Sequence, residues 1–160
     1  MHDTGQAFSH PGAAGDAERA AWMRVLALAD PAMLNDAFNA LGELPSRQWL
    51  RAPQTGMAMV RARTGGTGAQ FNLGDITVTR CAVSLAAGTM GVAYVQGRSA
   101  RHAEQAAVLD ALLQTADWRD RIRQAVIEPL ARHHAARKTQ QAAATAATRV
   151  EFFTLARGEG

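Results

Sequence analysis

The spacing of apolar residues changes twice along the chain, and each change marks a new type of element. Near the N-terminus, apolar side chains recur every three or four residues over 16–29 and again over 30–41, as on one face of an α-helix. Asp30 and Pro31 suit the start of the second helix, and Gly42 suits its end. These patterns predict that the chain opens with a helical hairpin.

Between residues 48 and 96 the period falls to two, which is the alternation of a β-strand. Pro53, a glycine-rich loop over 64–68, Gly74 and an Ala87-Gly88 turn divide this region into short pieces. Because the connections are short, we expect an antiparallel meander of about four strands. The pieces with strand alternation are 48–52, 57–63, 70–73, 76–85 and 90–96.

The helical period returns after Gly97, where Ser99 is a suitable N-cap. The first of these helices carries one apolar stripe, and Pro129 kinks or restarts the second. Residues 132–149 favour helix but offer almost no large apolar side chain, so this segment either packs through alanines or lies against a partner. The fold class is therefore expected to be α+β. The stripe consists of Ala106, Leu109, Leu113 and Ala116, and the second helix presents Ile122, Val126 and Leu130.

The length of 160 residues suits one domain, expected over 16–160, after a loose tail over 1–15 that has no periodic apolar face. Residues 22–29 resemble a signal sequence, but acidic residues precede them and Arg24 interrupts them. No apolar run approaches the length of a membrane span. The single cysteine, Cys81, excludes an internal disulfide and a zinc cluster, so we expect a cytoplasmic protein.

The formal charge of +3 is too small to indicate nucleic-acid binding by itself. The positive charge is concentrated between residues 98 and 149, which hold nine basic and five acidic side chains, so an anionic partner would be attracted there. RNA binding through the basic C-terminal helices is the weakest interpretation, because no aromatic residues are interleaved with the basic ones to stack on bases.

The residue chemistry indicates no catalytic group or metal site. His102-Ala-Glu104 matches half of a zinc deaminase signature, but the required P-C-x-x-C half is absent. His133 and His134 are adjacent, so on a helix they point about 100° apart and cannot chelate one metal together. Cys81 lies in a strand pattern without a base beside it, which favours a buried structural thiol.

Two places suit an anion. Arg61 and Arg63 precede the glycine-rich loop and Arg80 lies on a neighbouring strand, so backbone N–H groups and guanidinium forks are available there. The loop matches no phosphate-binding motif, and a plain turn or arginines paired with carboxylates across an interface remain alternatives. The second place is the helix start after Gly97, where solvated arginines are the simpler interpretation. The candidate phosphate, nucleotide or subunit-interface residues are Arg61, Arg63, Gly65, Gly66, Thr67, Gly68, Arg80, Gly97, Arg98, Arg101, His102 and Glu104.

Residues 150–155 form a compact apolar segment near the C-terminus. Its two aromatic residues, Phe152 and Phe153, would tuck into the core of a monomer or anchor the chain to a partner if it is a subunit. The pattern does not distinguish these two roles.

Seven motifs along the chain resemble those of the PhnG family and follow one another in the same order. Members of this family are subunits of the bacterial carbon–phosphorus lyase system for phosphonate degradation. The match runs from about residue 20 almost to the C-terminus, with Ser99 where the family often has Asp, and the first fifteen residues match nothing. The motifs are Arg63-Thr-Gly-Gly-Thr-Gly68, Phe71-Asn-Leu-Gly-Asp75, Thr77-Val-Thr-Arg80, Gly91 through Tyr94-Val-Gln-Gly-Arg98, His102-Ala-Glu104, Asp110-Ala-Leu112 and Arg149-Val-Glu-Phe-Phe-Thr154.

The resemblance implies an accessory subunit that is not catalytic on its own. PhnG-like proteins act with PhnI, PhnH and a PhnL-like ATPase to transfer a phosphonate to the ribose C1 of MgATP with release of adenine, and they share a core complex with PhnH, PhnI and PhnJ. MgATP is then a co-substrate of the complex, no cofactor is assigned to this chain, and no nucleic acid or membrane partner is expected. The alternative is a stand-alone phosphate- or nucleotide-binding protein. The phosphonate specificity and the stoichiometry stay open.

Overall fold

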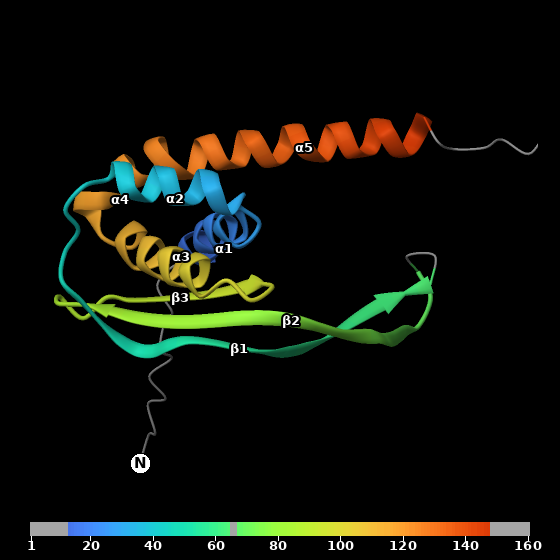
Figure 1. Cartoon of the computed structure of the whole chain (residues 1–160), viewed down its shortest axis with the longest axis horizontal. Helices are drawn as coiled ribbons and strands as arrows, with labels where there is room; N and C mark the ends of the chain where they lie inside the picture. The colour runs from blue at the N-terminus through green and yellow to red at the C-terminus, as the bar shows by residue number, and fades with distance from the viewer. Residues whose placement is uncertain (1–12, 65–66, 148–160) are drawn as a thin grey trace, which may run out of the picture.

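The computed structural model describes residues 13–64 and 67–147, which form a layer of helices over one face of a three-stranded antiparallel sheet (Figure 1). This arrangement confirms the α+β class. The sheet order is β1-β2-β3. The elements are α1 Ala13–Ala27, α2 Pro31–Ala40, β1 Arg47–Arg63, β2 Gln70–Leu85, β3 Met90–Gln96, α3 Ala100–Leu113, α4 Ala116–Ile122, η2 Arg123–Ile127 and α5 Glu128–Ala147.

The two N-terminal helices form as expected, although α1 begins at Ala13, three residues before Asp16. The Asp30 carboxylate caps α2 by accepting hydrogen bonds from the N–H groups of Ala32 and Met33 at 3.0 and 3.2 Å. Both helices pack against α3. The local capping chemistry was therefore a sound guide to where α2 begins.

The sheet has three strands rather than about four, because Pro53 and Gly74 lie inside strands instead of ending them. Pro53 is tolerated because β1 is an edge strand, and the register shifts between Arg51 and Gln54 on either side of it. Gly74 lies next to another shift, after Val60, where β2 holds one residue more than its partner. Both irregularities bend the strands without interrupting them.

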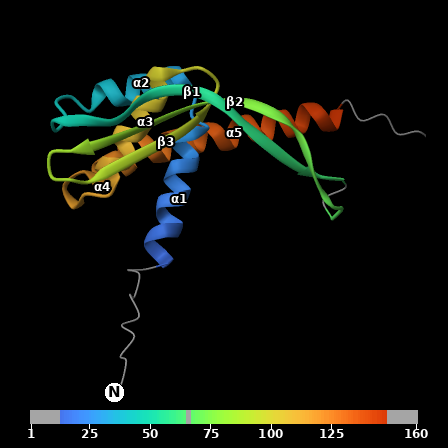
Figure 2. The ribbon, with the colours of Figure 1, turned by 90° about the horizontal axis from the view of Figure 1, so that it is seen from below.

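The unequal lengths of the strands create a projecting hairpin. β1 has 17 residues and β2 has 16, but β3 pairs only with Val78–Ser84 of β2. The remaining part of the hairpin, residues 57–64 and 67–77, is called the arm below. It extends beyond the helices and twists away from the sheet (Figures 1 and 2). In the same views α5 projects to the same side.

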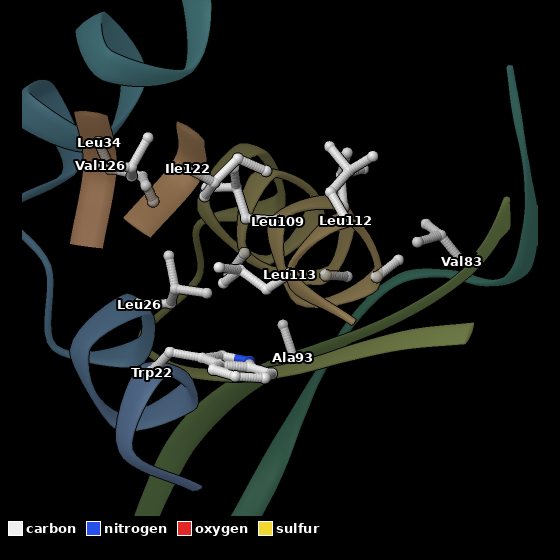
Figure 3. Close-up of a cluster of buried hydrophobic side chains, with 14 of the residues drawn as sticks. Trp22, Leu26, Leu34, Val83, Ala93, Leu109, Leu112, Leu113, Ile122 and Val126 are labelled. Carbon is white, nitrogen blue, oxygen red and sulfur yellow. The ribbon is translucent and has the colours of Figure 1, made fainter. Parts of the chain in front are cut away.

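Helix α3 is the centre of the core, with eleven of its fourteen side chains buried. The sheet covers one side of it, and α1, α2 and α4 cover others. Figure 3 shows Trp22 and Leu26 on one side of this helix and Ile122 and Val126 on another. The single apolar stripe expected from the sequence accounts for only part of the buried side chains of α3. Ala116 was expected on this stripe, but it is exposed and belongs to α4.

The C-terminal helix restarts at the predicted proline. A single π-helical turn, η2, precedes α5, and Pro129 occupies the first turn of α5, where its missing N–H costs little. All side chains of residues 135–146 are exposed, so this stretch does not pack through its alanines on the described part of the chain. None of the described helices combines the length and hydropathy needed to cross a bilayer.

Candidate functional site

The turn between β3 and α3 has the strand–turn–helix geometry that the sequence predicted. Gly97 has φ +94°, a left-handed conformation that glycine adopts without strain. Its N–H donates to the Thr77 carbonyl at 2.8 Å, and its carbonyl accepts from the Thr79 hydroxyl at 2.7 Å. The Ser99 hydroxyl accepts from the His102 N–H at 3.2 Å and caps α3. The turn is therefore held from both sides.

Two of the residues that we placed at this turn serve as ties between elements. His102 is buried, and its Nε2 lies 2.7 Å from the Leu26 carbonyl, so this nitrogen donates and joins α3 to the end of α1. Glu104 accepts from the Arg47 guanidinium at 3.2 Å, joining α3 to β1. Arg98 and Arg101 remain exposed. An anion-binding role for these two arginines stays a prediction.

An open surface depression of about 510 Å³ lies beside the start of α3. It presents one guanidinium, from Arg101, and one carboxylate, from Glu104. Because the Glu104 carboxylate repels a free anion, the depression suits a polar segment of protein better than inorganic phosphate. Its lining residues are Phe38, Asn39, Ala100, Arg101, Glu104 and Gln105.

The second candidate region lies at the tip of the arm. The Arg63 guanidinium donates to the Gly68 carbonyl at 3.1 Å, and the Gly68 N–H donates to the Thr64 carbonyl at 3.0 Å. A side chain at position 68 would place its Cβ 2.8 Å from that Thr64 oxygen, so glycine is needed for this close approach. Arg61 and Thr67 are exposed. Gly65 and Gly66 lie outside the described residues, as do Phe152 and Phe153.

The structure does not bring Arg80 to this loop. Arg80 pairs with Gln54 and Tyr94, whereas Arg63 pairs with Gln70, ten residues further along β2. At about 3.3 Å per strand residue, the two arginines are roughly 30 Å apart along the hairpin. The expectation that Arg80 joins Arg61 and Arg63 beside the glycine-rich loop is therefore wrong. The reason is that β1 and β2 continue through Pro53 and Gly74, where we expected the strands to end.

The densest polar cluster, around Asp110, was not anticipated. The Asp110 carboxylate is fully buried and accepts two hydrogen bonds from the Arg19 guanidinium at 2.8 and 3.1 Å. It also accepts from the Trp22 indole N–H at 2.9 Å and the Val92 N–H at 3.0 Å. The hydrogen bond that Arg19 donates to the Asp110 carboxylate raises the pKa of Arg19. The cluster joins α1, α3 and β3, and its sequence signals were a lone carboxylate in an apolar stretch of helix and the Asp110-Ala-Leu112 motif.

The buried Cys81 thiol has low reactivity. Its pKa is raised from 9.0 to about 11, first because burial disfavours the thiolate and second because of the negative charge of Glu104. The thiol is therefore protonated at neutral pH and is a poor nucleophile or metal ligand. This result agrees with the structural role expected for Cys81.

We expect Cys81 to resist Ellman's reagent at about pH 8 in the folded protein and to react fast once the chain is unfolded. Because the folded pKa is raised, the burial of this thiol stabilises the fold fully below pH 9.0, and that contribution is lost as the pH rises through about 11. Thiol titration with and without denaturant measures the first effect, and thermal melts across this range measure the second. Equal reaction rates in the two states would contradict the burial argument.

The comparisons with known proteins span nearly the whole of the described chain. The sequence profile of a family described as "Phosphonate metabolism protein PhnG" matches residues 17–158. The chain is also 42% identical over 146 residues to "Alpha-D-ribose 1-methylphosphonate 5-triphosphate synthase subunit PhnG" from Rhizobium meliloti (strain 1021). That alignment covers 91% of this chain and 93% of the relative, so it includes the arm, the turn before α3 and the Asp110 cluster.

Proposed function

Because this chain belongs to the PhnG family of phosphonate metabolism proteins, we propose that it is a subunit of an alpha-D-ribose 1-methylphosphonate 5-triphosphate synthase in the carbon–phosphorus lyase system. The observation that carries the proposal is the 42% identity over nearly the whole of both chains, since the relative's name describes it as a subunit of this synthase. A match that covers 91% of this chain extends through the helices and the sheet as well as the arm.

The reaction that we propose for the complex is transfer of a phosphonate to the ribose C1 of MgATP, with release of adenine. We propose PhnI, PhnH and PhnJ as partners in a core complex, with a PhnL-like ATPase, all in the cytoplasm. MgATP is a co-substrate of the complex in this scheme, and this chain supports the reaction without supplying a catalytic group.

Three observations on the reactive side chains support an accessory role. The His102 ring is committed to the Leu26 carbonyl, and the Asp110 carboxylate is committed to four hydrogen bonds. The Cys81 thiol is buried and protonated. These groups therefore hold the fold together and are not poised to act on a substrate.

The exposed apolar residues also favour a subunit over a stand-alone binding protein. Several large apolar side chains lie at the surface, although the protein has enough core to bury others fully. Apolar surface of this kind marks contact sites. The alternative of a stand-alone phosphate-binding protein loses one of its three supporting arginines, because Arg80 lies far from the glycine-rich loop that follows Arg63.

We expect this chain, carrying an affinity tag and co-expressed with the other subunits of the synthase, to co-elute with them as one large species in size-exclusion chromatography. Complex membership is the property that the relative's name implies, and an apolar surface stabilises assembly through burial. If the tagged chain elutes as a monomer while the partners are well expressed and unbound, the proposal fails. Stabilisation of the isolated chain by ATP or phosphate would then support the alternative.

A further inference from the structure

One face of the arm continues the inner face of the sheet. On β2, Thr79, Cys81 and Val83 are buried beneath the helices. Thr55 lies on the same face, because its hydroxyl is 3.1 Å from that of Thr79 across the strand pair. Since side chains alternate along a strand, Met57 lies on this face too, as do the alternate residues that follow it on β1. They are Met59, Arg61 and Arg63.

This face loses its cover where the arm begins. Met57 and Met59 are 77% and 59% exposed, and Leu73 at the strand irregularity is 64% exposed. The helices packed on the sheet, α1 and α3, end before this point, whereas the arm and α5 both continue outward to the same side (Figures 1 and 2). Over residues 70–77 the register gives β2 no strand neighbour besides β1 within the described part of the chain. The arm is thus an apolar sheet face without the layer that normally buries one.

The surface also changes character along its length. It is apolar at Met57 and Met59 and becomes cationic toward the tip at Arg61 and Arg63, with one carboxylate, Asp75, opposite Met59. A surface that fits it presents apolar side chains near the base of the arm and carboxylates near the tip. This combination describes a protein surface.

We propose that this face of the arm is a docking surface for a partner subunit, which places apolar side chains over Met57 and Met59 and carboxylates against Arg61 and Arg63. The inference rests on the proposed function, because the partner is another subunit of the synthase. It adopts the alternative that Arg61 and Arg63 pair with carboxylates across an interface, and it adds the two methionines, which the sequence motifs did not indicate.

Methionine oxidation by hydrogen peroxide tests the proposal, because oxidation follows exposure and mass spectrometry resolves each site. Met90 is the matched internal control, since it is 58% exposed at the start of β3 and lies away from the arm. We expect Met57, Met59 and Met90 to oxidise at similar rates in the isolated chain. In the assembled complex, oxidation of Met57 and Met59 should slow severalfold while oxidation of Met90 continues unchanged.

Three variants support the same test. Met57→Gln with Met59→Gln should weaken partner binding on the order of thirtyfold, the effect of losing one strong interface contact, while leaving the melting temperature near that of the wild type. Met90→Gln should bind as the wild type does. Arg61→Glu should also weaken binding, because it reverses the charge that faces the partner's carboxylates.

Four results would overturn the proposal. If the complex forms but the arm methionines oxidise as fast as in the isolated chain, the arm is not the docking surface, although the proposed function stands. If Met57 and Met59 oxidise fast in the isolated chain only after residues 148–160 are deleted, that segment occupies the docking surface. If the oxidation of Met57 and Met59 slows as the concentration of the isolated chain rises, a second copy of the chain occupies the docking surface. If no complex forms with the wild-type chain, the proposed function and this inference fail together.

Discussion

Replacing Gly91 with alanine is expected to lower the melting temperature by on the order of 10 °C, and Gly91→Val is expected to prevent folding. An ideal Cβ at position 91 would lie 2.0 Å from the Ala107 carbonyl oxygen and 2.5 Å from the Ala111 nitrogen. Both are backbone atoms of α3, so no side chain can rotate aside, and the helix would have to move away from β3. At about 3 kcal/mol or more, this cost is a large part of a typical domain's stability.

The matched control is Gly56→Ala on β1. A Cβ at that position meets nothing within 4 Å, and the residue is exposed. We expect this variant to melt close to the wild type, since only the unfolded chain loses freedom. Circular dichroism melts of the two alanine variants provide the comparison. If Gly91→Ala melts within the range of Gly56→Ala, the close contact between β3 and α3 is not present in solution.

Replacing Asp110 with alanine is expected to cost about 3 kcal/mol of unfolding free energy. The substitution leaves the Trp22 indole N–H and the Val92 N–H without their buried acceptor, and it removes the ion-pair partner of Arg19. The expected value is at the lower end for a broken buried pair, because the Arg19 side chain is 35% exposed and can turn toward water. Urea denaturation measures the loss as a lower midpoint.

Asp36→Ala serves as the matched control, because Asp36 is an exposed aspartate on another helix, α2. We expect it to change the unfolding free energy by no more than about 0.5 kcal/mol. Asp110→Asn keeps the shape and one acceptor oxygen, so it should fall between the two. An Asp110→Ala midpoint equal to that of Asp36→Ala would show that the cluster does not hold α1 against α3 and β3.

The local elements were predictable because their signals are local. The capping carboxylate of Asp30, the hydroxyl of Ser99 and the left-handed glycine at position 97 act within a few residues of their own positions. The period of two over 48–96 likewise identified an antiparallel sheet. The strand breaks at Pro53 and Gly74 were wrong, because an edge strand tolerates proline and a bulge absorbs the extra residue.

The candidate site was only partly predictable. The sequence correctly placed Arg98 and Arg101 on an exposed helix start, but it did not indicate the ion pair of Glu104 with Arg47. It did not reveal that His102 is buried against α1 or that Arg80 is far from the glycine-rich loop. These facts depend on which residues far apart in the chain become neighbours.

By itself the sequence determined the class of fold and the start of each capped helix, since caps, turn glycines and the apolar period all act over a few residues, and its ordered motifs indicated the PhnG family. Only the tertiary structure decided that α3 is buried on nearly every side, that Gly91 must lack a side chain and that Asp110 gathers its donors from α1 and β3. Packing and buried hydrogen bonds join residues separated by up to 91 positions, and no local pattern records which residues those will be.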